Sequence, residues 1–243
     1  MEKIEIKYLV KFIQNRQHAE NLATKGELHC NIPNYYYYLF ETTENLGQAD
    51  PWEASFLCVL RKNSHLPIYC MTAIFDSDSY SDIVETDNQK YICFQEKLIH
   101  TFCPHKPFYA VFFDFKPFFE IVKNDRSNGV QWAQGLVKYE DLSIEEQSSF
   151  LKYRTAQNLF SKHTCFCYQK EFRVCAQKEL DQTAIKTIGD HKEMIYVKDG
   201  KKYEGINYYL SELSSIAVLL SSDDFIYDPK LKEFLVPLSK LDK

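Results

Sequence analysis

The order of hydrophobic and polar positions along this chain predicts a protein built mainly from short strands. Residues 4–12 (IEIKYLVKF) and 165–176 (CFCYQKEFRVCA) alternate with a period of two, which places successive side chains on opposite faces of a sheet. Apolar or alternating runs bounded by turn residues predict further strands. These lie at residues 27–31, 56–60, 67–75, 90–94, 108–115, 129–141 (a strand pair), 194–206 (a hairpin at Asp199-Gly200) and 215–221.

Helices are fewer and are marked by their ends. Residues 15–26 begin at Asn15, a suitable N-cap, and stop at Gly26. Ser143 and Glu146 form a capping-box pattern that predicts a helix running to about Lys162, and residues 207–215 predict a short one. Residues 76–89 and 177–193 look like polar excursions. The mixture indicates an α+β fold without a βαβ rhythm.

Composition narrows the class of protein. The chain has 243 residues, 45% of them hydrophobic, with 18 Phe and 17 Tyr but only 7 Gly and 8 Pro. This favours a single domain over residues 1–243 and argues against disorder. Because there is neither a secretion-signal pattern nor an apolar run of roughly 20 residues, we expect a soluble, cytoplasmic protein with reduced cysteines and no membrane contact. The net charge of −5 supplies no general attraction to nucleic acid, although a local basic groove stays possible.

The chemistry of residues 165–176 is open to two interpretations. If the whole stretch is a strand, Gln169, Glu171 and Arg173 share one face while Phe172 and Val174 anchor the other. A carboxylate next to an amide suits the cleavage of a glycosidic bond, because it can stabilise the oxocarbenium-like state that develops there. The ordinary structural explanation is a surface ion pair between Glu171 and Arg173.

The segment YQKEFRV, residues 168–174, resembles the Gln-x-Glu strand of ADP-ribosyltransferases, in particular of the DarT-type toxins that modify nucleic-acid bases using NAD. The resemblance implies an ADP-ribosyltransferase-like α+β fold with split mixed or antiparallel sheets and flanking helices. It also implies three strands in chain order that hold NAD, line the pocket and carry the catalytic Glu. Residues 4–12, 68–73 and 168–174 are in the corresponding order.

The resemblance assigns roles to individual residues. Glu171 takes the catalytic position, where it would stabilise the oxocarbenium-like state through the ribose 2′-hydroxyl, and Gln169 would orient the acceptor. The NAD-binding candidates lie on the first two strands: Lys7, Tyr8, Lys11, Tyr69 and Thr72. The first strand departs from the family, which has an Arg or His there.

A looser resemblance covers about two-thirds of the chain by landmarks. The landmarks, in order, are similar to those of a widespread group of uncharacterised prokaryotic proteins found near phage-defence genes. Together the two resemblances imply a toxin in phage defence that transfers ADP-ribose to a macromolecule, with RNA or DNA favoured over protein and an antitoxin as a possible partner. The alternative is a non-enzymatic immunity, sensor or interaction module on the same fold, which the first-strand departure supports.

Other candidate sites have weaker patterns. The loop Gly47–Ala54 and the run Tyr35–Tyr38 are compatible with a nucleotide pocket or with ordinary packing. Zinc knuckles of the C-x2-4-C type are missing, so we predict no metal although two groups combine His and Cys: His163, Cys165 and Cys167, and His100, Cys103 and His105. The common hydrolase and phosphate-loop motifs are also missing. A catalytic Cys–His pair has no motif to support it, but the sequence does not exclude one.

Overall fold

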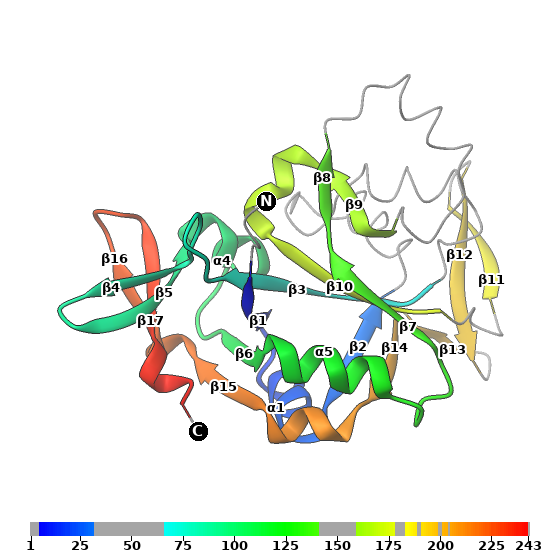
Figure 1. Cartoon of the computed structure of the whole chain (residues 1–243). Helices are drawn as coiled ribbons and strands as arrows, with labels where there is room; N and C mark the ends of the chain where they lie inside the picture. Colours follow the sequence, from blue (N-terminus) through cyan, green and yellow to red (C-terminus); the bar gives the residue numbers. More distant parts are fainter. Residues whose placement is uncertain are drawn as a thin grey trace.

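The structure is a computed structural model that describes residues 5–31, 66–140, 159–177, 183–188, 191–198, 201–203 and 205–242. Between residues 183 and 203 it describes the backbone alone. It shows an α+β protein whose sheets are mostly antiparallel (Figure 1). None of the described helices is long and apolar enough to cross a bilayer.

The main sheet has eight antiparallel strands in the order β14-β2-β3-β1-β6-β15, with β10 and β7 joined to the free edge of β3. Its strands are β1 (Ile6–Ile13), β2 (Glu27–Asn31), β3 (Ile68–Phe75), β6 (Tyr109–Asp114), β7 (Trp132–Leu136), β10 (Glu171–Ala176), β14 (Gly205–Tyr209) and β15 (Ala217–Ser221). The strand β3 therefore lies between β1 and β10.

Three smaller sheets accompany it. A four-stranded antiparallel sheet has the order β16-β17-β5-β4, and a three-stranded one has the order β11-β12-β13. The short strands β8 and β9 pair in parallel. Their bounds are β4 (Ile83–Thr86), β5 (Gln89–Gln95), β8 (Lys138–Glu140), β9 (Ser161–His163), β11 (Thr183–Ile188), β12 (His191–Lys198), β13 (Lys201–Tyr203), β16 (Ile226–Asp228) and β17 (Glu233–Pro237).

The described helices are short. They are the α-helices α1 (Arg16–Lys25), α4 (Glu96–Phe102) and α5 (Phe115–Asn124), and the 3₁₀-helices η2 (Thr164–Gln169), η3 (Ser211–Ser215), η4 (Ser222–Asp224) and η5 (Leu238–Lys240). In Figure 1, α1, α5 and η3 lie together on one side of the main sheet, while the four-stranded sheet lies beside α4.

The two faces of the main sheet are buried in different cores, as the period of two in its strands requires. Leu9 and Phe113 pack against α1 and α5, whereas Val10 and Phe112 pack against the four-stranded sheet and α4. A third, smaller cluster contains Leu66, Ile68, Leu159 and Cys175. Hydrophobic burial on both faces thus holds β1, β3 and β6 in the centre of the molecule.

Several sequence-based predictions are confirmed. The strand over residues 4–12 is β1, and the helix over 15–26 is α1, capped by Asn15 at its start and by Gly26 at its end. The hairpin over residues 194–206 is present, because Lys198 pairs with Lys201. Strands also occupy parts of the segments 27–31, 67–75, 90–94, 108–115, 129–141 and 215–221. The two strands within 129–141 do not pair with each other, since β7 pairs with β10 and β8 with β9.

Other predictions are wrong in part. Residues 165–176 are not one strand: η2 occupies Thr164–Gln169, and β10 begins only at Glu171. The side chain of His163 accepts a hydrogen bond from the Cys165 N–H and so starts a helical turn where alternation predicts a strand. The predicted helix up to Lys162 fails at its end, since Ser161–His163 is β9; its start at Ser143 lies outside the described residues.

The remaining differences concern elements that were not expected. The excursions at 76–89 and 177–193 contain β4 and β11, and the helices α4 and α5 had no prediction. The helix predicted over residues 207–215 is confirmed only for its second half, as η3, because its first residues end β14. The predicted strand at 56–60, the run Tyr35–Tyr38 and the loop Gly47–Ala54 lie outside the described residues.

Candidate functional site

The three strands predicted to form the site are neighbours in the main sheet. Val10 of β1 pairs with Thr72 of β3, and Thr72 pairs in turn with Glu171 of β10. Residues directly opposite each other in antiparallel strands project from the same face. The hydroxyl-bearing side chain of Thr72 therefore lies beside Glu171, although the two residues are 99 positions apart in the sequence.

Glu171 lies between two cations in the interior. Its Oε1 accepts a hydrogen bond of 2.6 Å from Arg173 Nε, and its Oε2 accepts one of 3.1 Å from Lys162 Nζ. Glu171 is 4% exposed and Arg173 0% exposed. The ion pair between Glu171 and Arg173 that the sequence suggested therefore exists, but it is buried and not on the surface.

The two cations decide the charge state of Glu171. Burial acts to raise its pKa, but the positive charges of Arg173 and Lys162 outweigh burial and hold the pKa well below its usual range. Glu171 is consequently an ionised carboxylate at neutral pH. Such a group is suited to stabilising positive charge and not to donating a proton.

Gln169 reaches the same cluster from the end of η2. Its Oε1 accepts a hydrogen bond of 2.8 Å from Lys162 Nζ, and its Nε2 donates to Tyr168 Oη over 3.4 Å. Lys170 separates it from Glu171 and adopts the left-handed conformation, with φ 46°. Gln169 and Glu171 thus share Lys162 as a partner even though only Glu171 belongs to the strand.

Sequence reasoning missed Lys162. It contacts both Gln169 and Glu171 with its ammonium group and is only 8% exposed. No local pattern marks a single Lys near the end of a predicted helix as the partner of a carboxylate. The tertiary fold brings Lys162 on β9 to Glu171 on β10.

The backbone around Glu171 is held on both sides. The N–H of Glu171 donates to Tyr139 Oη over 2.8 Å, and its carbonyl accepts from the Val137 N–H over 2.8 Å. On the other side, the carbonyl of Lys170 accepts from the Ala73 N–H over 2.8 Å. Burial, followed by the charge of Glu171, raises the pKa of Tyr139, so its hydroxyl stays protonated.

The predicted NAD-binding residues divide between the two faces of the sheet. Tyr8 packs with the cluster on the Thr72 face. Tyr69 belongs to the opposite core, and Lys11 follows it there, with Nζ 4.8 Å from the centre of the Tyr69 ring. Lys7 is exposed at the start of β1. The structure thus brings Thr72, but not Lys11 or Tyr69, to the side of Glu171, because alternate residues of a strand face opposite ways.

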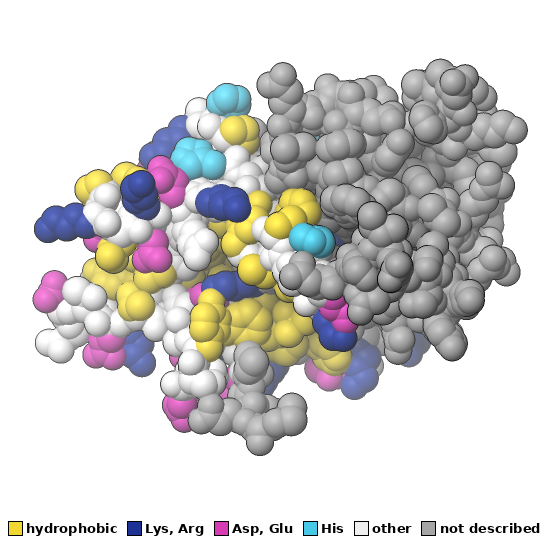
Figure 2. Space-filling view, turned by 90° about the horizontal axis from the view of Figure 1, so that it is seen from above, with side chains coloured by type: hydrophobic (Ala, Val, Ile, Leu, Met, Phe, Trp, Pro, Cys, Tyr) yellow, Lys and Arg dark blue, Asp and Glu magenta, His cyan; other side chains and the backbone are white. Residues whose placement is uncertain are grey.

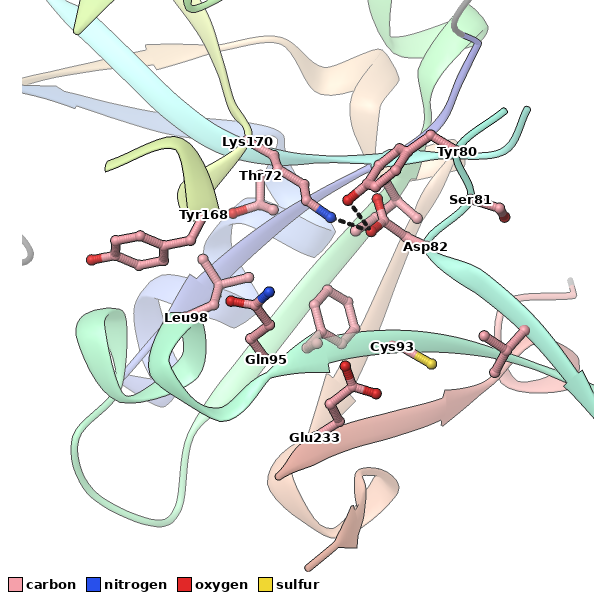
Figure 3. A pocket seen from close by; sticks show the side chains of 13 residues that line it. Thr72, Tyr80, Ser81, Asp82, Cys93, Gln95, Leu98, Tyr168, Lys170 and Glu233 are labelled. Atoms are coloured by element: carbon pink, nitrogen blue, oxygen red, sulfur yellow. Dashed lines mark hydrogen bonds and ion pairs between the residues drawn. The ribbon is translucent and has the colours of Figure 1, made fainter. Parts of the chain in front are cut away.

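A cavity of about 200 Å³ adjoins this cluster, and Thr72 and Lys170 line it. Glu171 itself is not among the lining residues. Lys170 forms an ion pair with Asp82, whose Oδ1 also accepts from Tyr80 Oη over 3.1 Å (Figure 3). Gln169 and Glu171 therefore contact the buried charge cluster, whereas Lys170 between them lines the cavity.

The described part of the face in Figure 2 shows no preference for a polyanionic partner. In Figure 2, Lys and Arg side chains are interspersed with Asp and Glu over the described part of the face. Among the same described residues, no three His, Cys, Asp or Glu side chains gather as metal ligands would. The group His163, Cys165 and Cys167 is divided between the end of β9 and η2.

Comparison of this chain with models of known protein families, with curated proteins and with solved structures finds no match. A function for this chain is therefore inferred from the site geometry and from the resemblance in residues 168–174.

Proposed function

We propose that this protein is an NAD-dependent ADP-ribosyltransferase in which Glu171 is the catalytic carboxylate. The observation that carries the proposal is the position of Glu171. It is ionised, pairs directly with Thr72 in the sheet and shares the hydrogen-bond donor Lys162 with Gln169. The resemblance to the Gln-x-Glu strand gives these residues the roles of catalytic Glu, acceptor-orienting Gln and pocket-lining hydroxyl. Gln169 departs from that strand pattern, because it lies at the end of η2.

The charge state of Glu171 suits the first step of this reaction. The bond between nicotinamide and ribose breaks with its electron pair leaving on the nicotinamide nitrogen, so the positively charged ring becomes neutral and needs no acid. The positive charge passes to the ribose, where a fixed carboxylate stabilises it. The acceptor then bonds to the same carbon and releases a proton. Glu171 acts first through its charge. It becomes the proton acceptor once the ribose has replaced part of its contact with Lys162 or Arg173, because those cations hold its pKa low.

The proposal also has a structural requirement. Because Glu171 is 4% exposed and paired with two cations, the ribose must reach it from the side of Thr72 and replace part of its contact with Lys162 or Arg173. Thr72 would then line the nicotinamide side of the site. Of the first-strand candidates, Tyr8 lies on the same face, while exposed Lys7 is placed to meet a phosphate only at the outer end of β1.

The biological role proposed with this activity is that of a toxin in phage defence. It rests on the resemblance to DarT-type toxins and to proteins near phage-defence genes. Nucleic acid is the favoured acceptor and protein the alternative. An antitoxin that blocks the site would be the partner.

Labelled NAD tests the activity. The full chain is incubated with labelled NAD in three separate reactions that contain RNA, DNA or lysate proteins. The variant Glu171→Gln and the exposed control Glu120→Gln on α5 are treated in the same way. We expect label transfer or nicotinamide release by the wild type and the control, and a loss of about 10²-fold or more in Glu171→Gln. Absence of NAD consumption in every mixture, or equal activity of Glu171→Gln, would contradict the proposal.

A second candidate function is a binding module without turnover, and the burial of Glu171 favours it. A carboxylate enclosed by two cations is also what a purely structural charge cluster contains. In that case Glu171→Gln lowers stability but changes no NAD chemistry. The same set of proteins separates the two functions when each variant is also unfolded with urea.

A further inference from the structure

The cavity beside the Gln169–Glu171 cluster contains polar groups that the proposed reaction does not use. It is enclosed by β3, β4, β5, β17, α4 and the link between η2 and β10. Gln95 and Glu233, which pair across β5 and β17, face Lys170 from the opposite side of the cavity in Figure 3. Polar groups that converge from separate strands on one small cavity are typical of a ligand site.

Three of these groups have no partner of their own. Among the described residues, the side chains of Thr72, Gln95 and Glu233 form no hydrogen bond or ion pair, although Thr72 is only 3% exposed. Of the three, Thr72 is buried, Glu233 is half-buried and Gln95 is exposed. A buried hydroxyl such as that of Thr72 gains free energy when a ligand supplies the missing hydrogen bond. The cavity therefore offers one hydroxyl, one amide and one carboxylate to a guest.

Lys170 forms the positive side of the cavity. Asp82 holds it there, and both oxygens of Asp82 are occupied: Oδ1 by Lys170 and Tyr80, and Oδ2 by the Phe75 N–H over 3.0 Å. Burial acts to lower the pKa of Lys170, but Asp82 and Tyr80 outweigh it and raise the pKa. Lys170 thus stays charged and retains N–H donors for a ligand, whereas both oxygens of Asp82 already accept hydrogen bonds.

Glu233 forms the negative side, and apolar side chains form part of the wall between the two charges. Ile74, Phe94 and Leu98 belong to it together with Cys93. Burial, followed by the charges of Glu233 and Asp82, raises the pKa of the Cys93 thiol to about 11 against the opposing charge of Lys170. Charges of both signs therefore act on the same space. A ligand that complements these walls carries one positive end, one negative end and a short apolar body.

We propose that this cavity binds an α-amino acid with an aliphatic side chain. The carboxylate of the ligand bonds to Lys170 and to the Thr72 hydroxyl, and its ammonium group bonds to Glu233 and to the Gln95 amide oxygen. Its side chain packs against Phe94 and Leu98. The volume of about 200 Å³ fits a ligand of this size and is below the roughly 300–1,000 Å³ of pockets for larger molecules. Binding requires no NAD, although the site shares Thr72 with the proposed reaction.

L-Leucine is the probe for the test, and two analogues each remove one of its charges. 4-Methylpentanoate lacks the ammonium group, and 3-methylbutylamine lacks the carboxylate. Titrated against the full chain by ligand-observed NMR, leucine is expected to bind, and each analogue to bind about tenfold more weakly or worse, because a charge-assisted hydrogen bond is lost. Failure of leucine to bind at millimolar concentration, or equal binding of an analogue, overturns the proposal.

The variant Glu233→Gln tests whether Glu233 binds the ammonium group of leucine. It should weaken leucine binding by about tenfold and leave the binding of 4-methylpentanoate unchanged, since that analogue has no group for Glu233. Glu212→Gln, on the exposed surface of η3, is the control and should bind leucine like the wild type. Thermal denaturation of Glu233→Gln verifies its fold; unchanged leucine binding in this folded variant contradicts the assignment. Because no NAD is present, failure here is distinguishable from failure of the proposed reaction.

Discussion

At the scale of single residues, the main feature is the balance of charges around Glu171. One carboxylate, two cations and a glutamine amide share a space that water hardly reaches. Burying any one of these ions alone would carry a large desolvation free energy. Opposite charges and hydrogen bonds within the cluster offset that penalty. The arrangement has a measurable consequence for stability whether or not the protein acts on NAD.

Removing the charge of Glu171 should change how stability depends on pH. The pKa of Glu171 in the folded protein lies well below the value of about 4.3 in an unfolded chain. Its contribution is therefore fully present above about pH 4.3 and is lost as the pH falls below it, because the unfolded chain then binds the proton more readily. Glu171→Gln should lower the free energy of unfolding by about 3–5 kcal/mol at pH 7 and flatten its decline in acid. Urea denaturation at a series of pH values measures both effects.

Glu20→Gln is the matched control for this prediction. Glu20 also pairs with an arginine, Arg16 on α1, but this pair lies at the surface, with Arg16 exposed and Glu20 half-buried. Such surface pairs contribute roughly 0–1 kcal/mol, so the variant should keep almost the wild-type stability and pH dependence. Similar behaviour of Glu171→Gln and Glu20→Gln would show that the buried cluster is not stabilised by its charges.

At the scale of elements, local signals predicted those structures whose cause is local. The strand β1 follows from its alternation, and α1 from caps at Asn15 and Gly26. The prediction of a strand before β10 was wrong because a capping contact from His163 starts a helical turn there and Lys170 adopts the left-handed conformation. Residues other than glycine rarely adopt that conformation, so the sequence does not predict it. Lys162 and Thr72 meet Glu171 only through tertiary packing. The candidate catalytic pair and its partner Arg173 could therefore be found in the sequence, but Lys162 could not.

The C-cap of α1 gives a prediction at this scale. Gly26 has φ 62°, and a Cβ atom there would lie 1.9 Å from the carbonyl oxygen of Leu210, which belongs to the backbone leading into η3. Gly129 has nearly the same φ, 63°, but its Cβ would meet nothing within 4 Å. Gly129→Ala should cost about 1–2 kcal/mol, the strain of the left-handed conformation alone. Gly26→Ala should cost clearly more, because the backbone of Leu210 must also move.

Chemical denaturation of the two glycine variants measures the difference. Their unfolding midpoints should fall in the order wild type, Gly129→Ala, Gly26→Ala. Equal midpoints for the two variants would mean that α1 and η3 do not approach each other as closely as the contact between Gly26 and Leu210 requires.

At the scale of the whole molecule, one sheet supplies a wall to two hydrophobic cores. Successive residues of β1 point into different cores, with Leu9 on the side of α1 and α5, and Val10 on the side of the four-stranded sheet. Damage to either core therefore acts on the same central strands. This arrangement supports the expectation of one folding unit, which the aromatic-rich, linker-poor sequence first suggested.

Two core variants, one on each side of the sheet, test whether the molecule unfolds as one unit. Phe118 of α5 is 0% exposed in the first core, and Phe94 of β5 is 1% exposed in the second. Phe118→Ala and Phe94→Ala should each lower the free energy of unfolding by about 3–5 kcal/mol through lost burial and a cavity. If the sheet couples the cores, each variant shifts a single transition, recorded identically by circular dichroism and by tryptophan fluorescence. If either variant separates the two signals into different transitions, the four-stranded sheet and α4 form a unit that unfolds independently of the main sheet, and the single-domain prediction is wrong.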